Sequence, residues 1–195
     1  MVYHATMTRA VDPELTALVA QVREAQQGAR DLAGALRADQ LLWRPESARW
    51  SIGECLNHLT VTVGRYLPML DAAIEHGRAR GRTGTGPFRY GWLSRRFVAM
   101  LEPPPKRRFK APAPFLPAAD LDAARVLPEF LARHDELIDR IERAQGLDLV
   151  RVTVRSPASA LLRLNLGKRF ELMCAHARRH LWQARQVVAE SSFPR

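Results

Sequence analysis

The chain has 195 residues, of which 47% are hydrophobic, and this length and composition favour one globular domain with a sizeable core. No uninterrupted apolar run reaches about 18 residues, so we expect no membrane-spanning helix and no membrane partner. The first residues lack the apolar centre of a signal peptide, and two cysteines are too few for a disulfide framework. These features predict a cytoplasmic protein.

The formal net charge of +10 is concentrated in one part of the sequence. Residues 78–110 contain a single acid, Glu102, and ten basic residues: Arg78, Arg80, Arg82, Arg89, Arg95, Arg96, Lys106, Arg107, Arg108 and Lys110. Three interpretations stay open: a solvated loop, a lid that attracts an anionic substrate or thiol, or a surface for nucleic acid. No nucleic-acid-binding motif is visible, which argues against the third.

Residues 12–36 are predicted to form the first long helix. Asp12 is a suitable N-cap, Pro13 suits the first helical position, and apolar residues then recur at three- and four-residue intervals. That spacing is typical of a helix in a bundle.

The second predicted helix has the clearest start in the sequence. Ser51 and Glu54 form a capping box, in which each side chain bonds the backbone amide of the other. The apolar pattern continues past Pro68, where we expect a kink or a loosened turn, and ends near Gly77.

Residues 78–119 are predicted to be a long connection, rich in glycine and proline, that holds one short helical piece from Trp92 to Leu101. Loops of this length in compact domains are usually functional or mobile. A connection this long also allows the second and third helices to run parallel.

The third helix is predicted over about 120–145, ending at Gly146. Residues 149–154 then read as extended, Ser156 and Pro157 end that segment, and a fourth helix is predicted over about 162–189.

Two of the six histidines, His176 and His180, are four residues apart in the fourth predicted helix. That spacing places both imidazoles on one helix face, about 6 Å apart. They interrupt an apolar face, where unsatisfied imidazoles are costly, and a shared metal ion would satisfy them. Because such a pair alone is a weak signal, a third ligand is needed. The best candidate is His58, two turns into the second predicted helix.

The other histidines fit this site less well. His76 follows His58 by 18 residues, which places it about 27 Å further along the helix. His4 falls in the N-terminal stretch, and chain ends are commonly frayed. His134 lies on the inner face of the third predicted helix, where it is either a hydrogen-bonded core residue or a ligand or partner of the site.

Three neutral imidazoles would leave a divalent ion its full charge and at least one open position, as in catalytic metal sites. A water in that position has its pKa lowered to about 7, and an added thiol would bind as the thiolate. The predicted site is therefore suited to supplying a nucleophile near neutral pH.

Two stretches of the chain resemble the DinB-like (damage-inducible) family of metalloenzymes. The opening stretch comprises residues 43–45 (WRP) and 50–59 (WSIGECLNHL), and the closing stretch comprises residues 176–183 (HARRHLWQ). Their order and separation also match the family, so the resemblance extends loosely over most of the chain.

This resemblance implies an all-α fold, a four-helix bundle with the order up-down-down-up and a long crossover between its second and third helices. It implies a single domain over residues 1–195 and metal ligands at His58, His176 and His180. The ion would be zinc or nickel, with iron or manganese as alternatives. Members with known activity transfer low-molecular-weight thiols or use one as a cofactor, and bundles of this kind often form homodimers.

Two polar residues near the candidate ligands each allow a structural and a functional interpretation. Glu54 is either only a cap or a catalytic base or orienting partner for His58, and Gln183 is either a surface residue or a hydrogen-bond partner of a ligand or substrate. Cys55 and Cys174 are more simply explained as small buried side chains than as nucleophiles.

We therefore expect a metal-dependent transferase or hydrolase that acts on a small molecule through a metal-bound thiolate or water. If the basic segment is a lid, that molecule is anionic. The alternatives are a metal-holding protein without catalysis and a basic bundle that binds nucleic acid.

Overall fold

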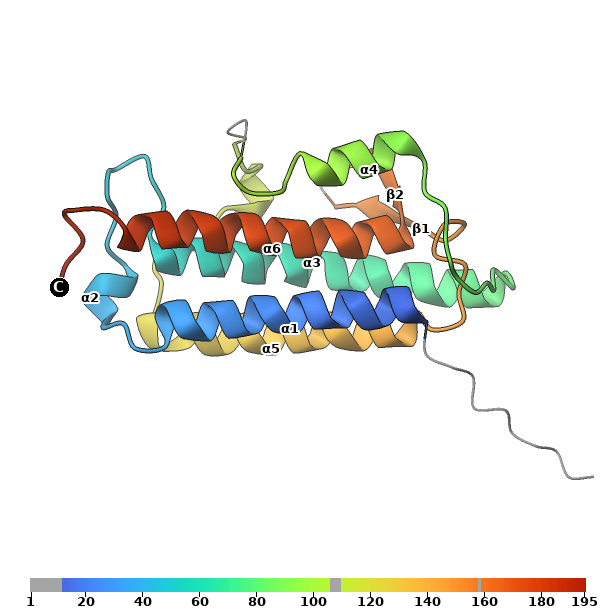
Figure 1. The fold of residues 1–195 in the computed structure, drawn as a ribbon, viewed down its shortest axis with the longest axis horizontal. Coiled ribbons are helices and arrows are strands. Elements are labelled where there is room, and N and C mark those ends of the chain that lie inside the picture. Colours follow the sequence, from blue (N-terminus) through green and yellow to red (C-terminus); the bar gives the residue numbers. More distant parts are fainter. Residues whose placement is uncertain (1–11, 106–109, 158) are drawn as a thin grey trace, which may run out of the picture.

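The computed structural model describes residues 12–105, 110–157 and 159–195, and these residues are mostly helical (Figure 1). The four long helices are α1 (Pro13–Ala33), α3 (Ile52–Ala79), α5 (Ala123–Arg143) and α6 (Leu166–Val188). The shorter elements are α2 (Ala38–Leu41), α4 (Trp92–Ala99), the 3-10 helix η1 (Ala113–Phe115), β1 (Thr153–Ser156) and β2 (Ser159–Asn165). Among the described residues, no helix has both the length and the apolar character needed to cross a membrane.

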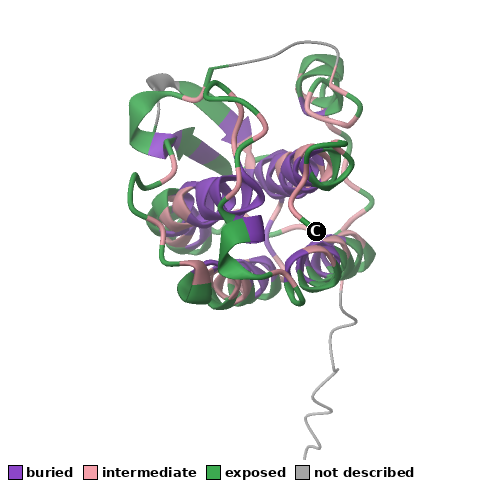
Figure 2. Ribbon diagram, turned by 90° about the vertical axis from the view of Figure 1, so that its left-hand side faces the viewer, coloured by how far each residue is buried: buried purple, intermediate pink, exposed green. Residues whose placement is uncertain are grey.

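The long helices lie side by side, and both α1 and α3 pack against α5 and α6. Figure 2 shows that buried residues gather on the sides of these helices that face one another. Ile52 and Leu56 of α3 belong to the same buried cluster as Ala177 and Leu181 of α6. Burial of each large aliphatic side chain stabilises the fold by about 1.5–3 kcal/mol. Because this burial requires the two apolar faces to meet, it fixes how α3 lies on α6.

The helix starts follow the capping residues in the sequence. The Asp12 carboxylate accepts a hydrogen bond from the Glu14 amide at 2.9 Å, and Ser51 and Glu54 form the predicted capping box. The first helix ends at Ala33, earlier than the predicted residue 36, and the third spans 123–143 within the predicted 120–145. Gly146 has a φ of 83°, a conformation that favours glycine after a helix.

The segment between α5 and α6 differs from the sequence-based expectation. Residues 153–156 and 159–165 pair as an antiparallel hairpin, so the extended segment begins later than predicted and a second strand was missed. The fourth helix was predicted to begin near residue 162, but it begins at Leu166, because residues 159–165 pair with β1 instead of coiling.

The long connection does not form one featureless loop. Its short helix, predicted from Trp92 to Leu101, ends at Ala99, lies over α6, and packs against it through Val98 (Figure 1). Further along, η1 packs against α3. Three basic residues of the segment 78–110 lie outside the described residues: Lys106, Arg107 and Arg108.

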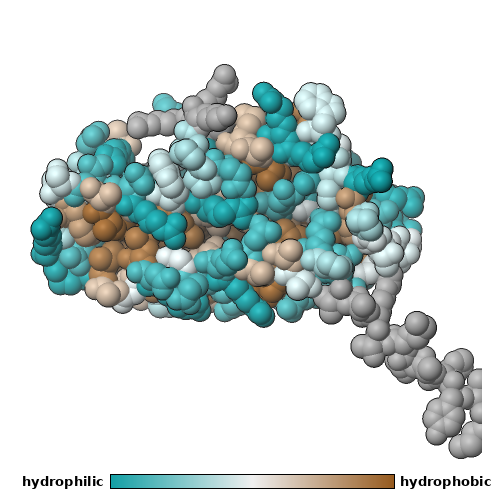
Figure 3. Space-filling view, viewed as in Figure 1, coloured by the Kyte–Doolittle hydropathy of each residue, from teal (hydrophilic) through white to brown (hydrophobic). Residues whose placement is uncertain are grey.

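Hydrophilic side chains cover most of the face shown in Figure 3, with smaller hydrophobic areas between them. The larger exposed apolar side chains include Trp92 and Leu93 at the start of α4. The connection therefore presents both basic and apolar groups to solvent.

Candidate metal centre

The start of α3 positions the first histidine. The Ser51 hydroxyl accepts a hydrogen bond from the Glu54 amide at 3.1 Å, and the Glu54 carboxylate accepts one from the Ser51 amide at 2.8 Å. Arg44 forms an ion pair with the same buried carboxylate. Both oxygens of Glu54 are thus engaged at the helix end, one turn before His58.

His58, His176 and His180 converge at the contact between α3 and α6. The Nε2 atom of His176 lies 3.2 Å from Nε2 of His58 and 3.0 Å from Nε2 of His180. One nitrogen from each ring lies within 4.8 Å of the other two, a grouping that could hold a single metal ion. The structure therefore brings His58 together with a pair of histidines that lies more than a hundred positions further along the sequence.

Two hydrogen bonds outside the cluster orient the rings. His58 Nδ1 lies 2.5 Å from the backbone oxygen of Phe115, and His180 Nδ1 lies 3.1 Å from Oε1 of Gln183. Since a carbonyl and an amide oxygen only accept hydrogen bonds, both Nδ1 atoms carry the proton. The Nε2 lone pairs of these rings are then available for a metal.

The electrostatic surroundings keep the imidazoles neutral. His58 is 4% exposed and His180 is 8% exposed, while His176 is half-buried. Burial lowers the pKa of all three, to about 3 for His176, and for His176 and His180 the neighbouring histidines lower it further. Neutral imidazole is the form that binds metals, so the cluster is competent at neutral pH.

Trp50 closes one side of the cluster. Its ring centre lies 4.8 Å from that of His58 and 5.7 Å from that of His180. The side chain therefore packs on two of the three candidate ligands, which limits their movement and the access of water.

The protein's own thiols are not part of this site. Cys55 and Cys174 are both buried, as expected from the sequence, and burial raises the pKa of each thiol, to about 12 for Cys174. Neither side chain supplies a thiolate near neutral pH.

The other two histidines that the structure describes, His134 and His76, do not belong to the cluster. His134 is buried, and its Nδ1 donates to the Phe130 carbonyl at 2.8 Å, which matches the core interpretation. His76 is exposed near the end of α3 and does not belong to the group. His4 lies outside the described residues.

The long connection contributes to the site in a way that the sequence did not predict. The Phe115 carbonyl holds His58, and the Ala118 amide donates to Oδ1 of Asn57 at 2.9 Å. A backbone carbonyl has no signature in a sequence, so only the length of the connection hinted at such a role.

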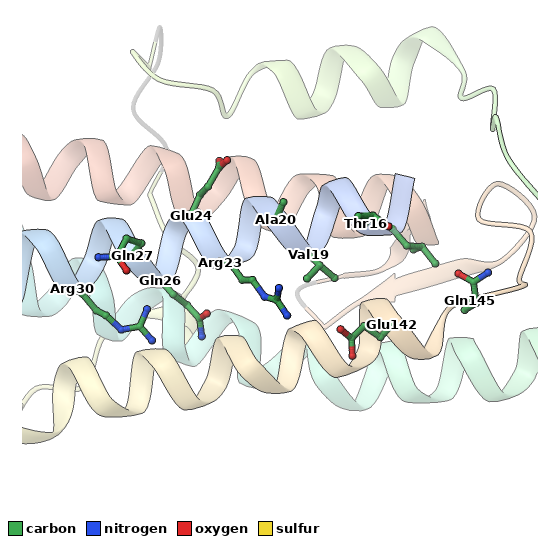
Figure 4. Close-up of a pocket in the computed structure, with 11 residues that line it drawn as sticks. Thr16, Val19, Ala20, Arg23, Glu24, Gln26, Gln27, Arg30, Glu142 and Gln145 are labelled. Carbon is green, nitrogen blue, oxygen red and sulfur yellow. The ribbon is translucent and has the colours of Figure 1, made fainter. Parts of the chain in front are cut away.

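A separate groove runs along α1 and α5 (Figure 4). Arg23 and Gln26 of α1 point toward α5 there, and Gln26 donates to Asp135 at 2.7 Å. None of the three clustered histidines lines this groove. The groove and the candidate metal centre are therefore different places in the fold.

The chain is mostly helical, and two of its helices bring three neutral imidazoles together. These features define a helical protein with a potential histidine metal site. The family model of the DinB superfamily matches residues 21–184, and the chain belongs to this superfamily. No curated protein and no solved structure gives a significant match.

Proposed function

We propose that this chain is a metal-dependent enzyme that acts on a small molecule, either as a thiol transferase or as a hydrolase. The observation that carries the proposal is the convergence of three neutral Nε2 atoms at one point between α3 and α6. Membership of the DinB superfamily supports the same conclusion.

The donor atoms fit a divalent ion. Three imidazole nitrogens suit zinc or nickel, with iron or manganese as alternatives, and would be supplied by His58, His176 and His180. When bound by three uncharged ligands, such an ion lowers the pKa of a water or an added thiol enough to give a nucleophile near neutral pH.

The surrounding residues orient the ligands and shield them. The Phe115 carbonyl and Gln183 fix the tautomers of His58 and His180, and Trp50 shields both rings. Glu54 secures the first turn of α3 and thereby positions His58. A catalytic role for Glu54 or Gln183 stays a prediction.

The overall arrangement we infer is one DinB-like domain over residues 1–195, built as an up-down-down-up four-helix bundle. In support, the chain runs one way along α1, returns along α3, repeats the direction of α3 in α5, and returns along α6 (Figure 1). A homodimer and a cytoplasmic location are further parts of the proposal.

The proposal is tested by loading the protein with zinc or nickel and measuring turnover of two substrate types. One assay follows addition of a small thiol to an electrophile, and the other follows hydrolysis of an activated ester. We expect the loaded protein to exceed both the metal-free protein and the His176→Ala variant at least tenfold in one assay. Equal rates in all three would favour a metal-holding protein without catalysis.

A further inference from the structure

A row of polar side chains continues from the histidine cluster along the contact between α3 and α6. On α6, Arg169 precedes His176 by seven residues, which places both on the same helix face, about 10.5 Å apart along the axis. On α3, Thr62 and Tyr66 follow His58 at four-residue steps along one side of the helix.

Arg169 is buried, and it forms no ion pair with any acidic residue in the described part of the chain. Its side chain is among the largest in the fold that are fully buried, and the residue is 1% exposed. Nη1 donates to the Tyr66 hydroxyl at 3.0 Å, and the guanidinium lies over the Tyr66 ring, 4.4 Å from its centre. Its Nε and Nη2 atoms have no hydrogen-bond partner within residues 12–105, 110–157 and 159–195.

Thr62 presents the same kind of unsatisfied group. Its Oγ1 is buried, the residue is 8% exposed, and no described residue forms a hydrogen bond with this oxygen. Among the residues that the structure describes, buried side-chain nitrogen and oxygen atoms without partners occur only on Thr62 and Arg169. Both residues belong to the two helices that supply the histidines.

Tyr66 alone does not balance the charge of Arg169. The Tyr66 hydroxyl is a neutral group, and it is also hydrogen-bonded to Oγ of Ser156 at 2.9 Å. A buried guanidinium normally pairs with a carboxylate or a phosphate, because removing an unpaired charge from water is energetically costly. Burial lowers the pKa of Arg169, and contact with Tyr66 only partly offsets this.

We propose that Arg169 and Thr62 form a binding subsite for the anionic group, a carboxylate or a phosphate, of the small molecule that reaches the histidines. The inference rests on the proposed function for the identity of that molecule, but the subsite itself requires no metal. Nε and Nη2 of Arg169 would donate to two oxygens of the anion, and the Thr62 hydroxyl would donate a third hydrogen bond.

The subsite is connected to the metal centre through Phe115. The Phe115 ring stacks on Tyr66, with ring centres 6.3 Å apart, and its carbonyl oxygen lies 2.5 Å from Nδ1 of His58. Tyr66 therefore contacts both Arg169 and the residue that orients His58. The spacing along α6 indicates a ligand whose anionic group is several bonds away from its reacting group.

The first test uses cobalt(II)-loaded protein and two thiols of equal length, 6-mercaptohexanoate and 6-mercaptohexanol. Thiol binding is followed by the change in the visible spectrum of the cobalt. We expect the carboxylate thiol to bind wild type about tenfold more tightly than the alcohol, and this preference to disappear in Arg169→Met. Arg163→Met removes an equal charge from an exposed position and should keep the preference.

The second test uses metal-free protein, so that it does not depend on the proposed function. Sodium propionate and sodium phosphate are compared with sodium chloride at equal ionic strength by thermal unfolding. We expect propionate or phosphate to raise the Tm of wild type but not of Arg169→Met, and the effective salt identifies the anion class. Thr62→Val should reduce the shift.

The two tests separate the possible failures. Absence of metal binding would overturn the proposed function, while the salt effect would still decide the subsite. If neither anion raises the Tm and the thiol preference persists in Arg169→Met, the subsite is wrong. A rise in the anion-free Tm of Arg169→Met would support an uncompensated charge, whereas a fall would indicate that Arg169 is a structural partner of Tyr66.

Discussion

Two hydrogen bonds decide which ring nitrogens of His58 and His180 face the centre of the cluster. The acceptors are the Phe115 carbonyl and Gln183, and each leaves an Nε2 lone pair directed at the other histidines. Metal affinity should therefore depend on residues that do not touch the metal.

Gln183→Ala tests this dependence. Loss of the acceptor for His180 Nδ1 frees the ring to rotate or to change tautomer, so we expect zinc affinity to fall about tenfold or more. The measurement is a competition titration against a chromophoric chelator. Gln186→Ala, an exposed glutamine on the same helix, is the matched control, and equal affinities of the two variants would contradict the role.

His134 should make the stability of the metal-free protein depend on pH. Burial lowers its pKa to about 4, well below the value of about 6.5 in an unfolded chain. The folded protein favours the neutral imidazole. The contribution of His134 to the free energy of unfolding is therefore complete above pH 6.5, and it is lost as the pH falls toward 4. The lowering of the His134 pKa corresponds to about 3 kcal/mol in the free energy of unfolding.

His134→Gln keeps a donor for the Phe130 carbonyl but cannot titrate. Urea unfolding at several pH values should show a shallower loss of stability in this variant than in wild type between pH 6.5 and 4. His76→Gln, at an exposed position, should follow wild type. Parallel curves for all three proteins would show that His134 does not contribute.

At the scale of elements, two glycines of α3 make opposite predictions. A Cβ at Gly64 would meet its nearest neighbour, Arg133 Nε, at an ordinary 3.5 Å, whereas a Cβ at Gly77 would lie 2.7 Å from a methyl group of Val152. We expect Gly64→Ala to stabilise the protein by about 0.5–1 kcal/mol through helix propensity. Gly77→Ala should destabilise it by about 1–2 kcal/mol through overpacking.

Chemical denaturation of the two variants beside wild type measures both effects. Because the two substitutions are identical and lie in one helix, propensity alone predicts changes of the same sign. An increase in stability for both variants would show that Val152 does not pack against Gly77 as closely as described.

The elements most predictable from sequence were those with local signals. Ser51 and Glu54 specify the start of α3 by bonding to each other's amides, and this requires no distant partner. The strand at residues 159–165 carried no such signal, because a short leucine-rich run fits a helix as well as a strand. Pairing with residues 153–156 decides its conformation, and that contact is tertiary.

In the candidate site, too, local features were predictable from sequence and tertiary contacts were not. The spacing of His176 and His180 indicated a shared ligand pair, since a helix places such residues on one face. His58 was the best remaining histidine by its place in the second helix. Phe115 was not predictable, because its contribution is a backbone carbonyl placed by the fold of the long connection.

At the scale of the whole molecule, the fold joins distant segments at one point. The cluster requires α3 and α6 to be packed correctly, the connection to return over α3 at η1, and the loop before α3 to place Trp50 on the rings. The groove between α1 and α5 contributes none of the three histidines. The candidate metal centre is therefore a product of the assembled fold and not of one local motif.

The central claim is tested most directly by elemental analysis of protein purified without an affinity tag. The comparison includes wild type, the triple variant His58→Ala, His176→Ala and His180→Ala, and the exposed control His76→Ala. The account predicts about one equivalent of a divalent metal in wild type and in the control, and none in the triple variant. Metal content that persists in the triple variant, or wild type that takes up no metal when zinc or nickel is supplied, would contradict it.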